Sequence, residues 1–244
     1  MKHGIVTASL ALLGMFLVAP EQSFGQAMPN RGTSFKVRIH NISTPTTIKA
    51  SNGTMHPAPN SPGVWVVHTE DGPFFTTGKP DRGKGLEAQA EEGNPTILAE
   101  SMKDHPGVVS SGVFNIPVGR TEPGPALPGD AYEFVIKGSP GMRFSFASMF
   151  GQSNDHFYAP GDAGVALFDG MGRPISGNIT DQVLLWDAGT EMDEEPGIGP
   201  NQAPRQPAPN TGPAEKGVVR VDNGYSGHRY PKVSEVLHVS LTPQ

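Results

Sequence analysis

Hydrophobic and polar residues alternate with a period of two in several stretches of this 244-residue chain. In residues 35–39, 132–136 and 142–146, large apolar side chains occupy every second position, and most positions between them are polar. This alternation predicts β-strands that bury one face. Residues 64–67 are all apolar, which predicts a strand at the centre of a sheet. Further strands are expected at residues 108–116, 164–168, 182–186 and 233–241.

Residues 84–103 differ from this pattern because their apolar side chains follow helical spacing. The spacing is interrupted at Gly93, Asn94 and Pro95, so two short helices are expected, the second with Asn94 as a cap. Strands lie on both sides of each irregular segment, which favours one domain over two. The chain is therefore expected to be all-β, an antiparallel β-sandwich with one or two short helices inserted.

The composition supports many short strands joined by irregular loops, because 31 glycines and 25 prolines interrupt the chain. Residues 193–216 hold few apolar side chains and several of these prolines, so we expect a Pro-rich surface excursion that is partly disordered. The absence of cysteine excludes disulfides, thiol chemistry and thiolate metal sites. A net charge of −6 without a basic stripe argues against non-specific nucleic-acid binding.

Residues 1–27 have the pattern of a signal peptide. A short basic start precedes an apolar run, and small residues at Gly25 and Ala27 offer a cleavage site. The apolar run is short for a membrane span. We therefore expect an exported protein that is periplasmic, held at the cell surface or secreted. The lack of cysteine favours a bacterial export product.

An acidic loop follows the apolar run at residues 183–186. It contains five carboxylates within nine residues, at Asp187, Glu191, Asp193, Glu194 and Glu195. Such crowding costs electrostatic energy unless a cation offsets it or the side chains point apart into water. Hard carboxylate oxygens suit Ca²⁺, and Gly189 would allow the chain to fold back on one ion. The local pattern leaves two interpretations open, a metal site and a solvated acidic turn.

A second polar loop separates two apolar stretches near residue 155. Asp155 lies at its apex, where it could donate a carboxylate to a metal ion. The alternative is an Asx turn, in which Asn154 or Asp155 bonds to its own backbone. His156 follows directly, but an isolated loop histidine is more often not a partner of a metal ligand.

These two loops resemble the signature of the spondin N-terminal (F-spondin) domain. The similarity is carried by residues 145–150 (Ser-Phe-Ala-Ser-Met-Phe), 153–155 (Ser-Asn-Asp), 164–168 and 186–191 (Trp-Asp-Ala-Gly-Thr-Glu). Weaker similarity extends over residues 34–242. The resemblance implies a sandwich similar to C2 domains with Ca²⁺ bound at one end. It also implies that the metal ligands are Asp155, Asp187 and Glu191, whereas Asp193 and Glu194 lie beyond the motif.

The chain departs from the family in two respects. His156 and Phe157 shift by one position the aromatic residue that often follows the first aspartate. The disulfides and thrombospondin-like repeats of animal members are absent, so the adhesion partners of those proteins are not transferred.

Three functional hypotheses follow. The first is a non-enzymatic calcium-binding module for extracellular or cell-surface adhesion, with an unknown protein or glycan as its partner. The alternative is a calcium-dependent carbohydrate-binding module, in which Phe157 or Tyr158 would supply an exposed aromatic surface. A metal-assisted hydrolase lacks a clear nucleophile and base. The C2-like shape suggests a membrane surface as a further partner, by analogy alone.

Overall fold

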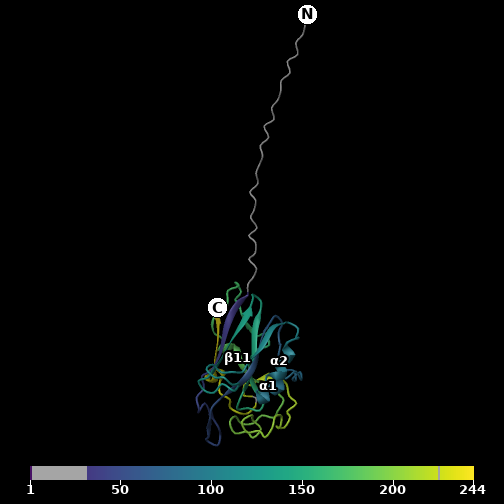
Figure 1. The fold of residues 1–244 in the computed structure, drawn as a ribbon. Coiled ribbons are helices and arrows are strands. Elements are labelled where there is room, and N and C mark those ends of the chain that lie inside the picture. The colour runs from purple at the N-terminus through teal and green to yellow at the C-terminus, as the bar shows by residue number, and fades with distance from the viewer. Residues whose placement is uncertain (2–31, 225) are drawn as a thin grey trace. The chain divides into compact units, whose positions relative to one another are not determined.

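Two antiparallel sheets pack face to face in the computed structural model, which confirms the expected antiparallel β-sandwich (Figure 1). The structure describes residues 1, 32–224 and 226–244. Apart from Met1, the predicted signal peptide lies outside the described residues. No helix in the described part of the chain is long and apolar enough to cross a membrane.

The smaller sheet contains four strands in the order β10 (Gly177–Asn178), β13 (Leu237–Pro243), β1 (Thr33–Asn41) and β6 (Ala131–Gly138). The larger sheet has the order β12 (Arg220–Val221), β11 (Val183–Asp187), β8 (His156–Pro160), β7 (Arg143–Phe150), β4 (Asn60–His68) and β5 (Val108–Phe114), and β9 (Val165–Ala166) also pairs with β7. A separate hairpin joins β2 (Ile48–Lys49) to β3 (Met55–His56). The short helices are α1 (Leu86–Glu92), α2 (Thr96–Met102), the 3₁₀ helix η1 (Thr180–Gln182) and α3 (Val233–Val236).

An aromatic core fills the space between the two sheets. Phe35 on β1 and Phe146 on β7 are fully buried, as the alternating pattern of these strands predicts. Phe114 on β5 stacks on Phe134 of β6, with ring centroids 5.2 Å apart. Burial of a large apolar side chain stabilises a fold by about 1.5–3 kcal/mol. This layer therefore supplies much of the stability of the sandwich.

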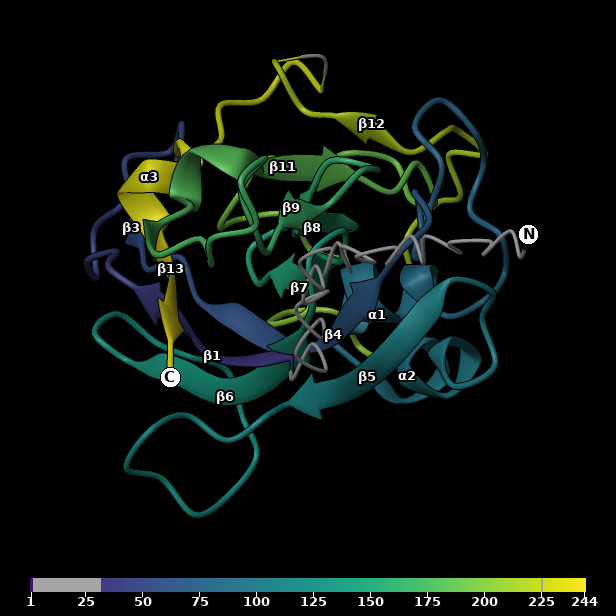
Figure 2. The ribbon, with the colours of Figure 1, turned by 90° about the horizontal axis from the view of Figure 1, so that it is seen from above.

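A second core covers the outer face of the larger sheet. Leu86 and Ala90 of α1, with Leu98 and Met102 of α2, belong to one buried cluster with side chains of the larger sheet. Figure 2 shows the two helices beside β4 and β5, away from β1 and β6. Because the larger sheet is covered on both faces, β4 is apolar throughout its centre, and it lies between β7 and β5 as predicted.

The structure corrects one strand prediction and adds one strand that was not expected. Residues 233–236 form the helical turn α3, and the strand predicted from residue 233 begins at Leu237. The Glu235 carboxylate accepts a hydrogen bond from the backbone N–H of Lys232 at 2.9 Å, which favours a helix start over an extended chain. Strand β8 was not predicted, because all five of its residues are buried and no alternation is visible.

The Pro-rich segment 193–216 packs more closely than the predicted surface excursion. Pro196, Gly197 and Gln202 are buried. The Gln202 side chain accepts a hydrogen bond from the Gly197 N–H at 3.0 Å and donates one to the carbonyl of Glu195 at 2.8 Å. The first half of the segment is therefore held by internal contacts, although most of its residues remain partly or fully exposed. Residues 207–210 are exposed.

Candidate metal centre

Three neighbouring strands of the larger sheet bring charged residues together at one end. In the antiparallel ladder, Asp187 on β11 lies opposite His156 on β8 and, on its other side, opposite Arg220 on β12. Asp155 precedes β8 at the end of the loop that follows β7. The sheet register thus places an acid, an imidazole and a guanidinium side by side.

The Asp155 carboxylate joins the two predicted loops directly. The side chain is completely buried. Its Oδ2 accepts hydrogen bonds from the backbone N–H groups of Thr190 at 2.8 Å and Glu191 at 3.1 Å. Its Oδ1 has no hydrogen-bond partner among the described residues. The Asp155 side chain therefore bonds to the acidic loop after β11, and the described residues show no Asx turn between it and its own backbone.

Asp187 is also buried and is engaged on both oxygens. Oδ1 accepts the backbone N–H of Gly189 at 2.6 Å, and Oδ2 lies 2.6 Å from Nη2 of Arg220. The turn requires glycine at position 189, where φ is +69°. A Cβ there would lie 2.6 Å from the backbone nitrogen of Val218. The Asp-Ala-Gly-Thr sequence therefore serves a close approach between the loop and the returning chain.

Glu215 completes a cluster of three carboxylates. Its Oε1 lies 2.7 Å from Nη2 of Arg220, and its Oε2 is buried with no hydrogen-bond partner among the described residues. One oxygen each from Asp155, Asp187 and Glu215 lies within 4.8 Å of the others. Oxygen ligands of one Ca²⁺ with bonds of about 2.3–2.6 Å are at most about 5 Å apart. The three carboxylates therefore have a spacing that could hold one ion.

Glu191 lies near this cluster but points elsewhere. Its side chain is buried, and it accepts hydrogen bonds from the Gly212 N–H at 2.8 Å and from Asn154 Nδ2 at 3.3 Å. In the described part of the chain, no close group of potential metal ligands includes Glu191. The structure thus brings together two predicted ligands, Asp155 and Asp187, and adds Glu215 where Glu191 was expected.

His156 lies among three carboxylates, and the sequence does not predict these contacts. It is fully buried, and its Nε2 lies 3.2 Å from Oδ2 of Asp222. Its Nδ1 lies 3.6 Å from Oδ1 of Asp155 and 3.7 Å from Oδ1 of Asp193. The imidazole stacks on the ring of Tyr230, with centroids 4.2 Å apart. His156 thus lies within ion-pair distance of Asp155, and the expectation that it is not a partner of a metal ligand stays a prediction.

The electrostatics of the centre show that its charges are incompletely balanced. Burial and the charge of Asp155 raise the pKa of Asp187 to about 7. Burial opposes ionisation of Asp155 as well, but the adjacent His156 and the N–H groups of Glu191 and Thr190 hold its pKa below the ordinary value. Burial disfavours the charged imidazole, yet Asp155 and Asp222 raise the pKa of His156 to about 10.

Carboxyl groups outnumber cationic side chains within the described cluster. Burial also raises the pKa values of Glu191 and Asp193. The cationic side chains in direct contact with the carboxylates are His156 and Arg220. The carboxylates they contact are Asp155, Asp187, Asp193, Glu215 and Asp222. A bound cation would relieve this excess.

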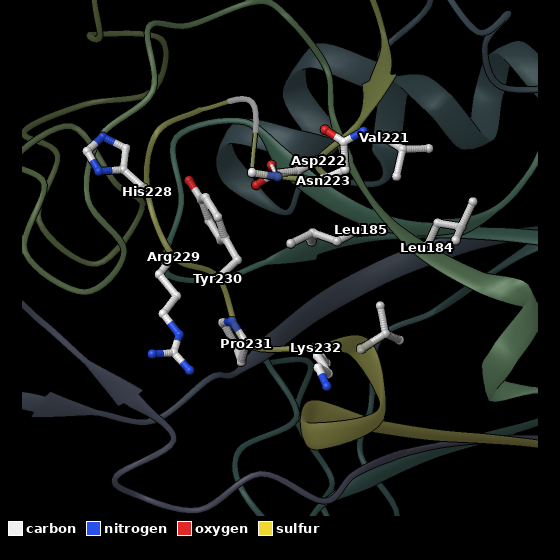
Figure 3. Close-up of a pocket in the computed structure, with 12 residues that line it drawn as sticks. Leu184, Leu185, Val221, Asp222, Asn223, His228, Arg229, Tyr230, Pro231 and Lys232 are labelled. Atoms are coloured by element: carbon white, nitrogen blue, oxygen red, sulfur yellow. Dashed lines mark hydrogen bonds between the residues drawn. The ribbon is translucent and has the colours of Figure 1, made fainter.

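A pocket of about 380 Å³ lies against the centre (Figure 3). Asp222 and Tyr230 line it, and both also contact His156. Figure 3 shows Arg229 pointing away from Asp222. Phe157 and Tyr158, the predicted sugar-binding aromatics, are completely buried, so that part of the carbohydrate-binding prediction is wrong.

Four residues of the centre gave no signal in the sequence. Glu215, Arg220 and Asp222 reach it only because the chain returns to pair β12 with β11. Tyr230 arrives from still later in the chain, and the hydrogen bond from the N–H of Glu215 to the carbonyl of Thr190 (2.9 Å) aligns the returning segment. The charge and periodicity of a single stretch do not reveal such contacts.

The fold and the centre together define an all-β sandwich with acidic groups, buried at one end, that could hold a metal ion. No model of a known protein family matches the chain, and a search of curated proteins finds no match either. Membership of the spondin N-terminal family, and the metal-ligand roles it implies for Asp155, Asp187 and Glu191, therefore stay predictions.

Proposed function

We propose that this chain is an exported, non-catalytic β-sandwich module that binds Ca²⁺ and serves extracellular or cell-surface adhesion. The observation that carries the proposal is the pair of buried carboxylate oxygens, Asp155 Oδ1 and Glu215 Oε2, that lack hydrogen-bond partners among the described residues. Buried polar atoms are almost always satisfied, so two such oxygens within one close cluster support a bound cation in addition to the ion pair between Asp155 and His156.

Calcium suits the ligand set of Asp155, Asp187 and Glu215, because all three offer hard oxygen donors. Ca²⁺ takes six to eight oxygens, so water and backbone carbonyls would complete its shell. Arg220 already contacts two of these carboxylates, and the ion would therefore add to an existing charge network.

The role of the ion would be to fix the end of the sandwich. Asp155 precedes β8, Asp187 ends β11, and Glu215 precedes β12. An ion that bound all three would hold the three segments together and form a rigid surface for a partner. An extracellular protein or a glycan is the partner class that fits an exported module of this kind.

Calcium titration of the purified, metal-free protein tests this proposal. An ion that binds only the folded state at 100 times its dissociation constant stabilises it by about 2.7 kcal/mol, which raises the melting temperature by roughly 5–10 °C. Asp187→Asn is expected to remove the rise. Asp181→Asn, an exposed aspartate in η1, is the matched control and is expected to keep it. A melting temperature that does not change in millimolar Ca²⁺ would contradict the proposal.

The adhesion role needs a separate measurement. Binding of the protein to immobilised matrix proteins and to a glycan array is compared in Ca²⁺ and in EDTA. Calcium-dependent binding that Asp187→Asn abolishes is the expected result. Binding to glycans alone would favour the carbohydrate-binding alternative. Binding that is equal in Ca²⁺ and in EDTA would show that adhesion does not depend on the metal centre.

A further inference from the structure

We infer that the centre contains a second cation position, formed by Asp155, His156 and Asp193, that takes a nitrogen-preferring divalent metal such as Zn²⁺. One ligand atom from each of these residues lies within 4.8 Å of the others. The set differs from the oxygen-only set proposed for Ca²⁺, although Asp155 belongs to both.

The spacing of the three atoms fits a shared ion better than a hydrogen bond. His156 Nδ1 lies 3.6 Å from Asp155 Oδ1 and 3.7 Å from Asp193 Oδ1, and both distances are too long for hydrogen bonds. Zinc bonds of about 2.0–2.2 Å in a tetrahedron place ligand atoms roughly 3.3–3.6 Å apart. The two separations from Nδ1 lie at or just above that range, and the ligand atoms of all three residues lie within 4.8 Å of one another.

All three atoms are buried and have no hydrogen-bond partner among the described residues: Asp155 Oδ1, His156 Nδ1 and Asp193 Oδ1. Asp155 and His156 are completely buried, and the Asp193 side chain is 12% exposed. These neighbouring atoms meet at ion-pair distances without forming hydrogen bonds, so their burial is costly in the absence of a ligand. An ion bound to all three removes that cost at once.

The surroundings of the imidazole also match those of a metal ligand. Nε2 faces the Asp222 carboxylate at 3.2 Å, and a metal-bound histidine commonly donates its second ring N–H to a carboxylate. This contact leaves Nδ1 as the ring nitrogen that can bind a metal ion, and stacking on Tyr230 fixes the ring plane. When the ion binds, Nδ1 releases its proton to solvent, because only the neutral nitrogen has a lone pair to offer.

The chemistry of the donors sets the preference of this position. Imidazole nitrogen with carboxylate oxygen suits Zn²⁺ and related transition metals, whereas Ca²⁺ takes oxygen ligands. Asp193 belongs to this position and to no close ligand group with Asp187 in the described residues. The two positions therefore respond to different substitutions.

Isothermal titration of Zn²⁺ into metal-free protein tests the inference. We expect one equivalent to bind, at least tenfold more weakly in His156→Gln and in Asp193→Asn. Asp187→Asn is expected to keep Zn²⁺ binding while losing the calcium response. His105→Gln removes a histidine on the loop after α2 and is the control for adventitious binding. Asp193→Asn preserves side-chain shape, so its result stands even if His156→Gln fails to fold.

Anomalous diffraction at the zinc edge locates the ion. A peak within bonding distance of His156 Nδ1 supports the inference, and a peak confined to other histidines overturns it. Absence of Zn²⁺ binding, or binding that neither Asp193→Asn nor His156→Gln weakens, also overturns it. Zinc binding in a protein that ignores Ca²⁺ would uphold this position and refute the calcium proposal, so the two outcomes are distinguishable.

Discussion

The aromatic core between the sheets and the candidate metal centre at the end of the larger sheet both contain fully buried side chains, but they are opposite in chemistry. Strand β8 passes through both environments, since Phe157 and Tyr158 enter apolar clusters directly after His156 enters the charged one. Burial of the aromatic rings stabilises the fold. Burial of the imidazole and its carboxylates costs free energy that hydrogen bonds, ion pairs or a bound cation must offset. The degree of burial of a side chain therefore does not by itself show how much that side chain stabilises the fold.

The largest effect is expected from breaking the aromatic core alone. Phe146→Ala leaves a cavity between the sheets and should lower the free energy of unfolding by about 3–5 kcal/mol, measured by urea denaturation. The increment from Ca²⁺ should stay unchanged, because Phe146 lies outside the ligand set. Val135→Ala on β6, where the side chain is 52% exposed, is the control and should change little. Loss of the calcium increment in Phe146→Ala would show that the two regions are not separate.

A smaller effect is expected at Glu91, a buried acid of α1 that lies outside the ligand sets. Burial raises its pKa to about 8 from 4.5, and the charges of Glu191 and Asp155 act in the same direction. A carboxyl whose pKa is higher in the folded state contributes stability that is present below pH 4.5 and is lost as the pH rises to 8.

The variant Glu91→Gln should therefore flatten the decline of unfolding free energy between pH 5 and 8. The slope should change by about 1 kcal/mol per pH unit, since one proton corresponds to 1.36 kcal/mol per unit. Urea denaturation at several pH values in EDTA provides the measurement. Glu100→Gln on the exposed face of α2 is the control. Parallel curves for Glu91→Gln and the unaltered protein would contradict this assignment.

The smallest effect on stability, but a specific one on the centre, is expected from Gly189→Ala. A left-handed conformation costs a residue with a Cβ about 1–2 kcal/mol, and the Cβ would press on the backbone of Val218. The shift should also move Arg220 and Glu215 away from Asp187 and weaken calcium binding, measured by isothermal titration. Gly170→Ala introduces a Cβ into open space and should leave both quantities unchanged.

The sequence predicts the sandwich well where one face of a strand is buried and the other is exposed. Strand β1 shows this, because Phe35, Val37 and Ile39 point into the core while the residues between them are partly exposed. The prediction fails where both faces are covered, as in β8, or where a side chain caps a turn, as Glu235 does for α3. An alternating sequence pattern predicts a strand only when one face is buried and the other is exposed. When both faces are buried, the alternation disappears and the strand cannot be predicted in this way.

The centre divides in a similar way. Asp155 and Asp187 are expected together from the resemblance to the spondin N-terminal domain, because the local pattern of each segment leaves a metal site and an ordinary turn both open. Glu215 and Arg220 could not be predicted, since their places depend on the pairing of β11 with β12 across the whole Pro-rich segment. His156 looks like any isolated histidine until its three carboxylate neighbours are known.

The pairing of Asp187 with Arg220 joins the two ends of the intervening segment, so residues 188–219 form a closed loop. A loop whose ends are held together tolerates changes in length, because doubling the length of a flexible loop costs only about 0.6 kcal/mol of closure entropy. The exposed stretch at residues 207–210 is then a natural place for insertions or grafted sequences. An insertion there would lengthen the loop while the ion pair between Asp187 and Arg220 continues to join its two ends.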